Sequence, residues 1–347
     1  MSAPRLTPAR ALVLERPGEP MQRVTRAIPS PARGQAVVRV LATAVNFHDV
    51  LNVSGLQPNV TWPRVPFTDN CGEIIAVGEG AGPWRTGDRV IANFFPDWVD
   101  GRPQPAYCDV VYGDQIDGFL QDFNVVDART LVRAPSHLSA AESATLACAG
   151  LAAWRCVAVE AQVQTGSVVV IQGTGGVALF ALQFAKLLGA EVILISSSDR
   201  KLDKGRGLGA DHLHNYSREP AWDQRVLEIT GGRGADLIVE VGGAGTLMRS
   251  INATRMDGHI SVIGVRTGFG VTTPMAVEPV LMKNLTLRGI TVGSANDLRL
   301  MCRAMELHQL RPVIDRHYPF EDAAAAIALM QSQSHIGKIV IDVESRT

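Results

Sequence analysis

The sequence predicts an α/β protein with two parts: a doubly wound parallel sheet and a second, β-rich domain. Three observations indicate this fold class. From about residue 165, continuous apolar strands alternate with helix-compatible segments, which is typical of a parallel sheet covered on both faces. Residues 1 to about 145 are instead rich in Pro, Gly and short β-like runs without that alternation. The 347 residues are enough for two domains.

The composition excludes several functional classes. The chain is 46% hydrophobic and 19% charged with a net charge of -1, so it offers no basic field for nucleic acid and no polybasic block for a membrane surface. We find neither a secretory leader nor an apolar run long enough to span a membrane. The five scattered cysteines show no C-x-x-C spacing, which favours reduced thiols in the cytoplasm.

The elements of the N-terminal part are short strands. Gln35–Thr43, Cys71–Val77 and Asp88–Asn93 have strand-like apolar patterns, and four glycines between 78 and 87 mark turns. The tail, roughly residues 298–343, has two helical stretches and a last strand, Lys338–Asp342. This strand lies outside the strand–helix alternation, so we expect it to return to the first domain.

The second part begins with an apolar strand, Val168–Gln172, followed by a glycine-rich turn and an apolar helix, Val177–Leu188, with Gly189 as C-cap. Glu191–Ser196 is the next strand. Further buried strands are predicted at Asp236–Val241, His259–Val265 and Leu285–Val292. Parallel strands joined by helices in this way form a sheet whose carboxyl edge binds ligands.

The turn after the first of these strands consists of Gly173, Thr174, Gly175, Gly176 and Val177. Glycines there let the backbone approach a pyrophosphate, and the following helix offers unpaired N–H groups at its positive dipole end. The motif therefore predicts a Rossmann-type dinucleotide site. The alternative is a tight turn that binds no ligand.

The next strand ends in residues 196–201, which read Ser-Ser-Ser-Asp-Arg-Lys. An NAD site usually has an acid at the strand end to bind the ribose hydroxyls, whereas hydroxyls and cations suit the 2′-phosphate of NADP. The pattern favours NADP, with NAD still open because Asp199 lies close. Alternatively, Arg200 and Lys201 begin a solvated helix. The predicted contacts are Ser196, Ser197, Ser198 and Lys201.

Taken together, the motifs resemble the medium-chain dehydrogenase/reductase superfamily over nearly the whole chain. The matching segments are 46–55, 69–78, 87–90, 173–177, 208–211 and Gly337-Lys338. The resemblance implies a GroES-like catalytic domain from 1–149 and 291–347, a Rossmann domain from 150–290, and an active site in the cleft. It also implies a homodimer paired through an edge strand such as Leu285–Val292.

The superfamily contains both zinc alcohol dehydrogenases and zinc-free quinone or enoyl reductases. In the zinc members, Cys, His and Cys bind the metal and a Glu lies beside the His. The matching positions here hold Asn46, Thr68 and Cys148, with Asp69 in place of the Glu. One thiolate with an amide and a hydroxyl is a poor zinc set. We therefore expect no metal, and Cys148 to be a small buried side chain.

Without zinc, hydrogen-bond donors must stabilise the charge that develops on the substrate oxygen. The resemblance places Asn46 and His48 at the floor of the cleft. His48 titrates in a range that suits a general acid. The alternative is a structural His48 that packs beside Phe47 and hydrogen-bonds Asp49. We expect Asp49 to orient its neighbours rather than to react.

Weaker cofactor predictions fall on Tyr216, Val241, Gly264 and Val265, which end or follow strands near the same edge. Lys338 is a further cofactor prediction, although a lysine at the start of a strand is usually only solvated. The leading hypothesis is a zinc-free, NADP(H)-dependent reductase of a quinone, an enone or another activated carbonyl. One alternative is an alcohol dehydrogenase or carbonyl reductase of the same superfamily. The other is a dinucleotide-binding protein without turnover.

Overall fold

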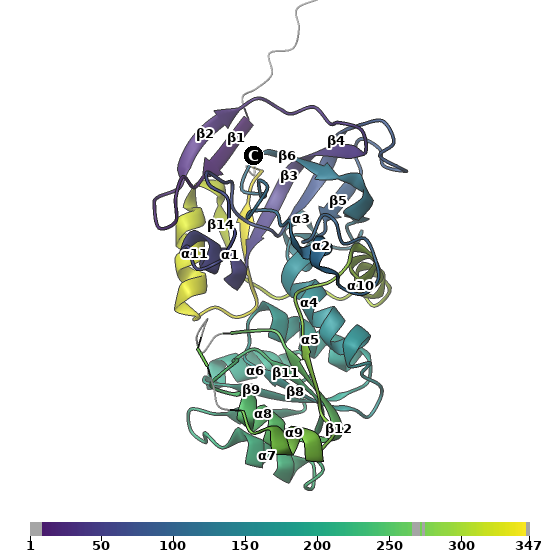
Figure 1. Ribbon diagram of the computed structural model, residues 1–347, viewed down its shortest axis with the longest axis vertical. Helices are drawn as coiled ribbons and strands as arrows, with labels where there is room; N and C mark the ends of the chain where they lie inside the picture. The colour runs from purple at the N-terminus through teal and green to yellow at the C-terminus, as the bar shows by residue number, and fades with distance from the viewer. Residues whose placement is uncertain (1–8, 266–270, 273–274, 345–347) are drawn as a thin grey trace, which may run out of the picture. The chain divides into compact units, whose positions relative to one another are not determined.

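The structure is a computed structural model that describes residues 9–265, 271–272 and 275–344. The chain divides into two compact units (Figure 1). Unit 1 is Met1–Leu151 with Gly293–Thr347, and unit 2 is Ala152–Val292. The sequence placed the boundaries after residues 149 and 290, so each differs by two residues from the division in the structure.

Unit 2 is built on the predicted doubly wound sheet. Its described residues form six strands in the order β10-β9-β8-β11-β12-β13, and all neighbours run parallel. The strands are β8 (Val168–Gln172), β9 (Glu191–Ser196), β10 (His212–Asn215), β11 (Ala235–Glu240), β12 (Thr254–Val262) and β13 (Thr286–Gly289). Every residue of β8 is buried because helices cover both of its faces.

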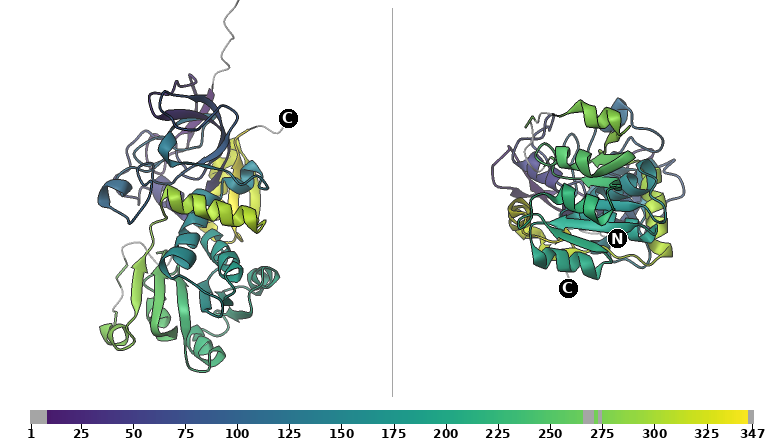
Figure 2. Two further views of the ribbon diagram at one scale, coloured as in Figure 1. Left: turned by 90° about the vertical axis from the view of Figure 1, so that its right-hand side faces the viewer. Right: turned by 90° about the horizontal axis from the view of Figure 1, so that it is seen from below.

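The helices of unit 2 lie on both sides of this sheet, as the view from below shows (Figure 2). They are α5 (Gly176–Leu187), α6 (Asp199–Gly207), α7 (Trp222–Ile229), α8 (Leu247–Ala253) and α9 (Val277–Met282). Helix α5 buries Leu179, Phe180 and Phe184. Its C-cap is Leu188, one residue before the predicted Gly189, and Gly189 follows with a φ of 81° that only glycine adopts readily.

Strand β12 ends at Val262 rather than at the predicted Val265. The N–H groups of Ile263 and Gly264 both turn to the carbonyl oxygen of Glu240, at 2.9 and 3.3 Å, which ends the regular ladder. Strand β13 is shorter than the predicted 285–292 and is the last strand in the sheet order.

Unit 1 contains a sheet that the structure orders β14-β15-β3-β4-β5-β7 within the described residues, with β6 also paired to β3. Its strands are β3 (Gln35–Val45), β4 (Cys71–Val77), β5 (Arg89–Ala92), β6 (Phe123–Asp127), β7 (Leu131–Arg133), β14 (Ile314–Pro319) and β15 (Lys338–Asp342). A separate pair joins β1 (Ala9–Val13) to β2 (Gln22–Arg26). As predicted, the last strand returns to the first domain, where β15 pairs antiparallel with β3.

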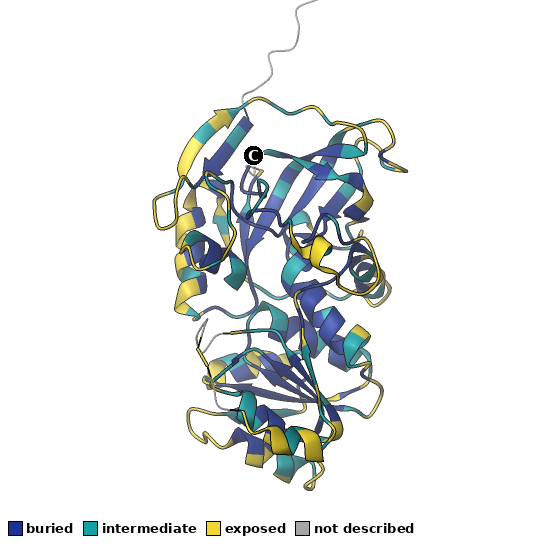
Figure 3. Ribbon diagram, viewed as in Figure 1, coloured by how far each residue is buried: buried dark blue, intermediate teal, exposed yellow. Residues whose placement is uncertain are grey.

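Short helices connect these strands: α1 (Phe47–Val53), α2 (Pro105–Cys108) and α3 (Ala140–Ser143). Longer helices α10 (Ala295–Leu307) and α11 (Ala323–Ser332) flank the sheet, and α4 (Leu151–Trp154) lies at the unit boundary. The strands of both sheets are largely buried (Figure 3). No helix among the described residues is both long and apolar enough to cross a bilayer.

Candidate active site

The predicted dinucleotide motif lies where β8 passes into α5. Gly173 has a φ of 81°, and its N–H donates to the carbonyl oxygen of Ile195 at 2.7 Å. Gly175 is the N-cap of the twelve-residue α5. The local sequence therefore places the unpaired N–H groups of a helix N-terminus directly after a buried strand, an arrangement that suits a phosphate.

The other predicted cofactor residues of unit 2 follow strand ends at the same edge. The strand registers align Gln172 with Ile195, Asn215 with Ser196, and Glu240 with Val262. Because these strands are parallel, the residues that follow them meet at the carboxyl edge. The structure thus brings the glycine turn together with Ser196, Ser197, Ser198, Tyr216, Val241, Gly264 and Val265.

A buried carboxylate holds the loop after β11 in place. Glu240 is 0% exposed, and its Oε1 accepts from the N–H groups of Gly242 and Gly243 at 2.8 and 2.9 Å. The hydroxyl of Thr246 donates to the same oxygen, and Gln172 donates to Oε2 at 2.6 Å. Sequence reasoning read Glu240 only as part of a strand and missed that it organises this edge.

The three serines at residues 196–198 differ in their exposure. Ser196 is buried at the end of β9, Ser197 is exposed, and Ser198 is the N-cap of α6. Asp199, which kept NAD open as an alternative, is ion-paired with Arg218 and accepts from Asn215 Nδ2 at 2.7 Å. Arg218 therefore compensates the charge of Asp199, which would lower the repulsion between Asp199 and a phosphate bound close by.

In unit 1, Lys338 lies beside Asn46. Strand register explains the contact. Ile339 pairs with Val45, so Lys338, which precedes Ile339, lies beside Asn46, which follows Val45. The Nζ of Lys338 donates to Asn46 Oδ1 at 2.5 Å, to Asp69 Oδ2 at 2.8 Å and to Val45 O at 3.1 Å. Lys338 is 2% exposed and Asp69 is 0% exposed.

This geometry changes the expectation for Lys338. We predicted it as a cofactor contact, but an ammonium has three N–H donors and all three have protein acceptors. None remains for a cofactor phosphate while these bonds are intact. The other carboxylate oxygen of Asp69 accepts from the N–H of Cys148 at 2.9 Å, so Asp69 is fixed from both sides.

The hydrogen bond and the ring contact of His48 go to residues other than the Asp49 and Phe47 that a structural role predicted. Its Nε2 lies 3.0 Å from Oδ1 of Asp114, which is 1% exposed, and its ring packs edge-on against Phe94. The His48 side chain keeps 18% of its surface exposed. Burial alone would lower the pKa of His48, but the hydrogen bond and charge of Asp114 outweigh it, so this pKa is raised.

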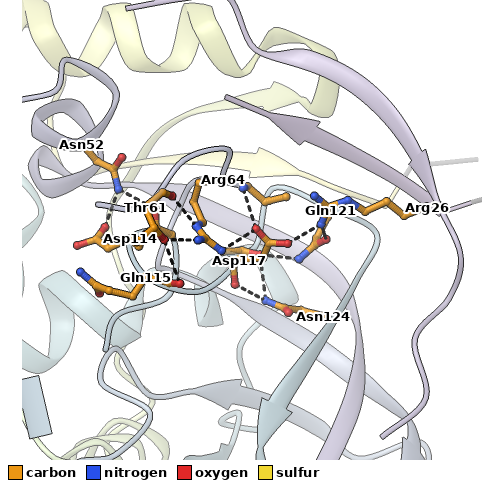
Figure 4. A network of polar contacts seen from close by, with 12 residues as sticks. Arg26, Asn52, Thr61, Arg64, Asp114, Gln115, Asp117, Gln121 and Asn124 are labelled. Atoms are coloured by element: carbon orange, nitrogen blue, oxygen red, sulfur yellow. Dashed lines mark hydrogen bonds and ion pairs between the residues drawn. The ribbon is translucent and has the colours of Figure 1, made fainter. Parts of the chain in front are cut away.

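Asp114 is held by a side chain of helix α1 and by hydrogen bonds that fix its own loop at Asp117. Asn52 Nδ2 donates to Asp114 Oδ1 at 2.6 Å, as Figure 4 shows. Three residues further on, Asp117 accepts from Arg26 and Arg64, and its Oδ1 also accepts from the N–H of Val65. Because these bonds fix the loop, Asp114 can orient the His48 ring. Asp114 is 66 residues from His48, and no local pattern pointed to it.

Asp49 is buried, and the charges of His48, Asp69 and Lys338 all act on it. Its Oδ2 accepts from the N–H of Asn46 at 2.7 Å. Burial raises the pKa of Asp49 to about 7, against the opposing charge of His48. Its contact is thus with the backbone of a predicted catalytic residue, as expected for an orienting role.

Several buried polar atoms of this region have no hydrogen-bond partner among the described residues. They are Nδ2 of Asn46, Oδ1 of Asp49, Oδ1 of Asn52 and Oγ1 of Thr68. Leaving such an atom unpaired costs about 1–3 kcal/mol, so a group of them in one place calls for a ligand or water as the missing partner. Together with His48, they define the candidate active site in unit 1.

The residues at the zinc positions do not fit the metal. The ammonium of Lys338 occupies both Asn46 Oδ1 and Asp69 Oδ2, and its charge would repel a second cation. Burial and then Asp69 raise the pKa of the Cys148 thiol well above its ordinary value, which disfavours the thiolate that zinc binds. Among the described residues there is no cluster of three His, Cys, Asp or Glu suited to a metal ion.

A groove of about 900 Å³ lies elsewhere in unit 1, and its lining includes Trp84, Arg133 and Arg303. Arg133 packs over the Trp84 ring and is ion-paired with Asp88 at 2.6 Å. The lining does not include the residues of the candidate active site.

Two family models match the two parts of the chain. The alcohol dehydrogenase GroES-like domain matches residues 32–136, and the zinc-binding dehydrogenase model matches residues 176–306. A zinc-type alcohol dehydrogenase-like protein of Schizosaccharomyces pombe is 39% identical over 316 residues, which cover 90% of this chain and 91% of that protein.

Other relatives are also similar over nearly their whole length. An acryloyl-coenzyme A reductase of Metallosphaera sedula is 24% identical over 90% of this chain and 93% of its own. The crystal structure of a candidate alcohol dehydrogenase from Sinorhizobium meliloti 1021 has a TM-score of 0.90 at 40% identity, covering 96% of this chain and 98% of that one. Both parts of the fold therefore occur together in these relatives.

Proposed function

The chain belongs to the medium-chain dehydrogenase/reductase superfamily and is an alcohol dehydrogenase-like, NAD(P)-dependent oxidoreductase. We propose that it reduces an activated carbonyl, an enone or a quinone without zinc. The single observation that carries the proposal is the buried ammonium of Lys338 among the acceptors Asn46 and Asp69. The similarity to an acryloyl-coenzyme A reductase supports a conjugated carbonyl as the substrate class.

Residues at the carboxyl edge of the unit 2 sheet would hold the cofactor. The turn from Gly173 to Val177 would bind the pyrophosphate at the N-terminus of α5. The pairing of Asp199 with Arg218 and Asn215 supports NADP, because Ser196, Ser197 and Lys201 are then not opposed by an unpaired acid. When bound, the reduced nicotinamide supplies the hydride.

Residues of unit 1 would stabilise the negative charge on the substrate oxygen and supply the proton for the reduction. The Asn46 Nδ2 group, buried and without a partner, would donate to the substrate oxygen as negative charge develops there. His48, whose protonated form is favoured by its hydrogen bond to Asp114, would deliver the proton that completes the reduction. A conjugated substrate spreads this negative charge, so hydrogen bonds can take the role that a metal has with a simple ketone.

The test measures NADPH consumption by metal-depleted protein with 1,4-benzoquinone, 2-cyclohexen-1-one and propanal, with NADH assayed alongside. We expect turnover of the quinone or the enone, a preference for NADPH, and no gain when Zn²⁺ is added back. Metal content measured by mass spectrometry should stay well below one zinc per chain. Reduction of propanal alone, or activity that requires Zn²⁺, would favour a zinc alcohol dehydrogenase instead.

We also propose that the protein is a homodimer. Strand β13 is the last strand in the order of the unit 2 sheet, and helix α9, which precedes it in the chain, is coloured mostly as exposed in Figure 3. Val277, Leu281 and Met282 are 64%, 71% and 65% exposed. A second copy that pairs with this edge would cover them. The cytoplasmic location remains a prediction from the cysteine pattern.

A further inference from the structure

We propose that Lys338 is a positioning residue that fixes the Asn46 amide, so that Nδ2, rather than Oδ1, faces the substrate oxygen. The inference rests on the proposed reduction and adds a residue to its machinery. It starts from a chemical asymmetry: an ammonium can only donate hydrogen bonds, and an amide nitrogen cannot accept one. Lys338 therefore selects one of the two nearly isosteric orientations of the Asn46 side chain.

The ammonium itself is held firmly. Asp69 Oδ2 lies 2.8 Å from Nζ, and Val45 O accepts its third hydrogen bond at 3.1 Å. Asp69 is fixed in turn by the N–H of Cys148 on its other oxygen. With Lys338 only 2% exposed, its Nζ is shielded from bulk solvent, so leaving Asn46 would cost it a hydrogen bond. The bonds thus run from Cys148 through Asp69 and Lys338 to the amide.

The bond from Lys338 to Oδ1 determines what the Nδ2 end of the Asn46 amide can contact. With Oδ1 on the ammonium at 2.5 Å, the N–H groups of Nδ2 are buried and have no acceptor among the described residues. An oxygen atom of a ligand would satisfy them, and an oxygen that becomes more negative during reaction would satisfy them best. If the amide were flipped, Oδ1 would face that oxygen and repel it.

Asp49 supports the same orientation from the backbone. Its Oδ2 accepts from the N–H of Asn46, which fixes the main chain from which the amide projects. The side chain can then turn only about its χ1 and χ2 torsions, and the hydrogen bond from Lys338 Nζ to Oδ1 restricts both. Fixing a donor before the reaction begins is the physical basis of electrostatic preorganisation.

The test is a double-mutant cycle on kcat. Removing only the ammonium would leave Asp69 buried and unpaired, so Lys338→Met is combined with Asp69→Asn. We expect this pair to lower kcat about 10²-fold, with little change in the KM for NADPH, because a misoriented donor fails in the transition state. In an Asn46→Ala background, the same pair should cause no further loss. An equal loss in both backgrounds, or full activity of the pair, would overturn the proposal.

A matched control removes another Lys–Asp ion pair. Lys186 and Asp211 lie 2.7 Å apart in unit 2 and are partly exposed. Lys186→Met with Asp211→Asn makes the same chemical change at a pair that does not contact Asn46, and it should keep kcat.

An NMR comparison separates this proposal from the proposed function. With ¹⁵N-asparagine labelling, the Asn46 side-chain signal is identified by its loss in Asn46→Ala. It should split or broaden in the Lys338→Met/Asp69→Asn protein as both amide orientations become populated, and stay single in the control. A single sharp signal in both would refute the role of Lys338. If the unaltered protein reduced no acceptor, the proposed function would fail, while this comparison would still decide whether Lys338 holds the amide.

Discussion

Lys338 and Asp69 form an ion pair with 2.8 Å between Nζ and Oδ2, and their side chains are 2% and 0% exposed. In a site of this kind, each charge stabilises the protein only while the other is present. The pair joins the last strand of the chain, β15, to the segment before β4. It therefore contributes both to the stability of unit 1 and to the arrangement of its candidate active site.

We predict that Lys338→Met alone lowers the free energy of unfolding by about 3–5 kcal/mol, because it leaves a buried carboxylate unpaired. Adding Asp69→Asn should recover most of this loss, since the remaining groups are neutral. Urea denaturation of the three proteins measures the effect. Additive losses in the combined variant would show that the two charges do not depend on each other.

The rate of reduction should depend on pH through His48. Its pKa is raised above the ordinary 6.5, so the proton-donating form predominates below the raised pKa and is lost as the pH increases through it. We expect kcat to be level below the raised pKa and to fall as the pH increases through it. Asp114→Asn should move the fall to lower pH, because it removes the carboxylate that raises the pKa. His48→Gln should lower kcat about 10²-fold or more and abolish the fall. A profile that Asp114→Asn leaves unchanged would argue against His48 as the proton donor.

Cofactor preference should respond to an acid at the end of β9. Ser196→Asp places a carboxylate where an NAD site has one, and its charge would repel the 2′-phosphate. We expect kcat/KM for NADPH to fall roughly tenfold or more while that for NADH rises, measured in steady-state assays with one acceptor. Ser196→Ala is the control, because it removes the hydroxyl without adding charge. Equal effects of both variants on NADPH would indicate that Ser196 does not face the phosphate.

Glu240 should be essential to the stability of unit 2. Glu240→Gln replaces a carboxylate that accepts from Gly242, Gly243 and Thr246 with an amide whose N–H groups face these donors. We expect a loss of about 3 kcal/mol in urea denaturation and weaker NADPH binding by fluorescence titration. Glu228→Gln, on the exposed face of α7, is the control and should change stability by less than about 0.5 kcal/mol. A loss no larger than that of the control would mean that the loop does not depend on the Glu240 charge.

The homodimer can be tested at the exposed edge of unit 2. Leu281→Glu combined with Met282→Glu should convert a dimer to a monomer in sedimentation velocity, because two charges would be buried at the interface. Leu307→Glu, at an equally exposed leucine of unit 1, should leave the dimer intact. A monomeric unaltered protein, or a dimer that survives both charges at α9, would place the contact elsewhere or exclude it.

The features that depend on residues close together in the chain could be predicted from the sequence alone. Continuous apolar runs such as Val168–Gln172 identified the parallel strands, because a strand buried on both faces has no polar side. The glycine turn at Gly173 was visible for a similar reason, since its positive φ is a local requirement. The return of Lys338–Asp342 to the first domain followed from a strand left outside the strand–helix alternation.

Which side chains meet in the candidate active site depends on the folded chain and could not be predicted from the sequence. Lys338 is 292 residues from Asn46, and Asp114 is 66 residues from His48. These contacts depend on the register of β15 against β3 and on the loop anchored by Asp117, and neither leaves a periodic pattern in the chain. Lys338 resembled a solvated lysine or a cofactor contact until its burial beside Asp69 was known. Burial and long-range pairing determine what such a charge does, and the folded chain sets both.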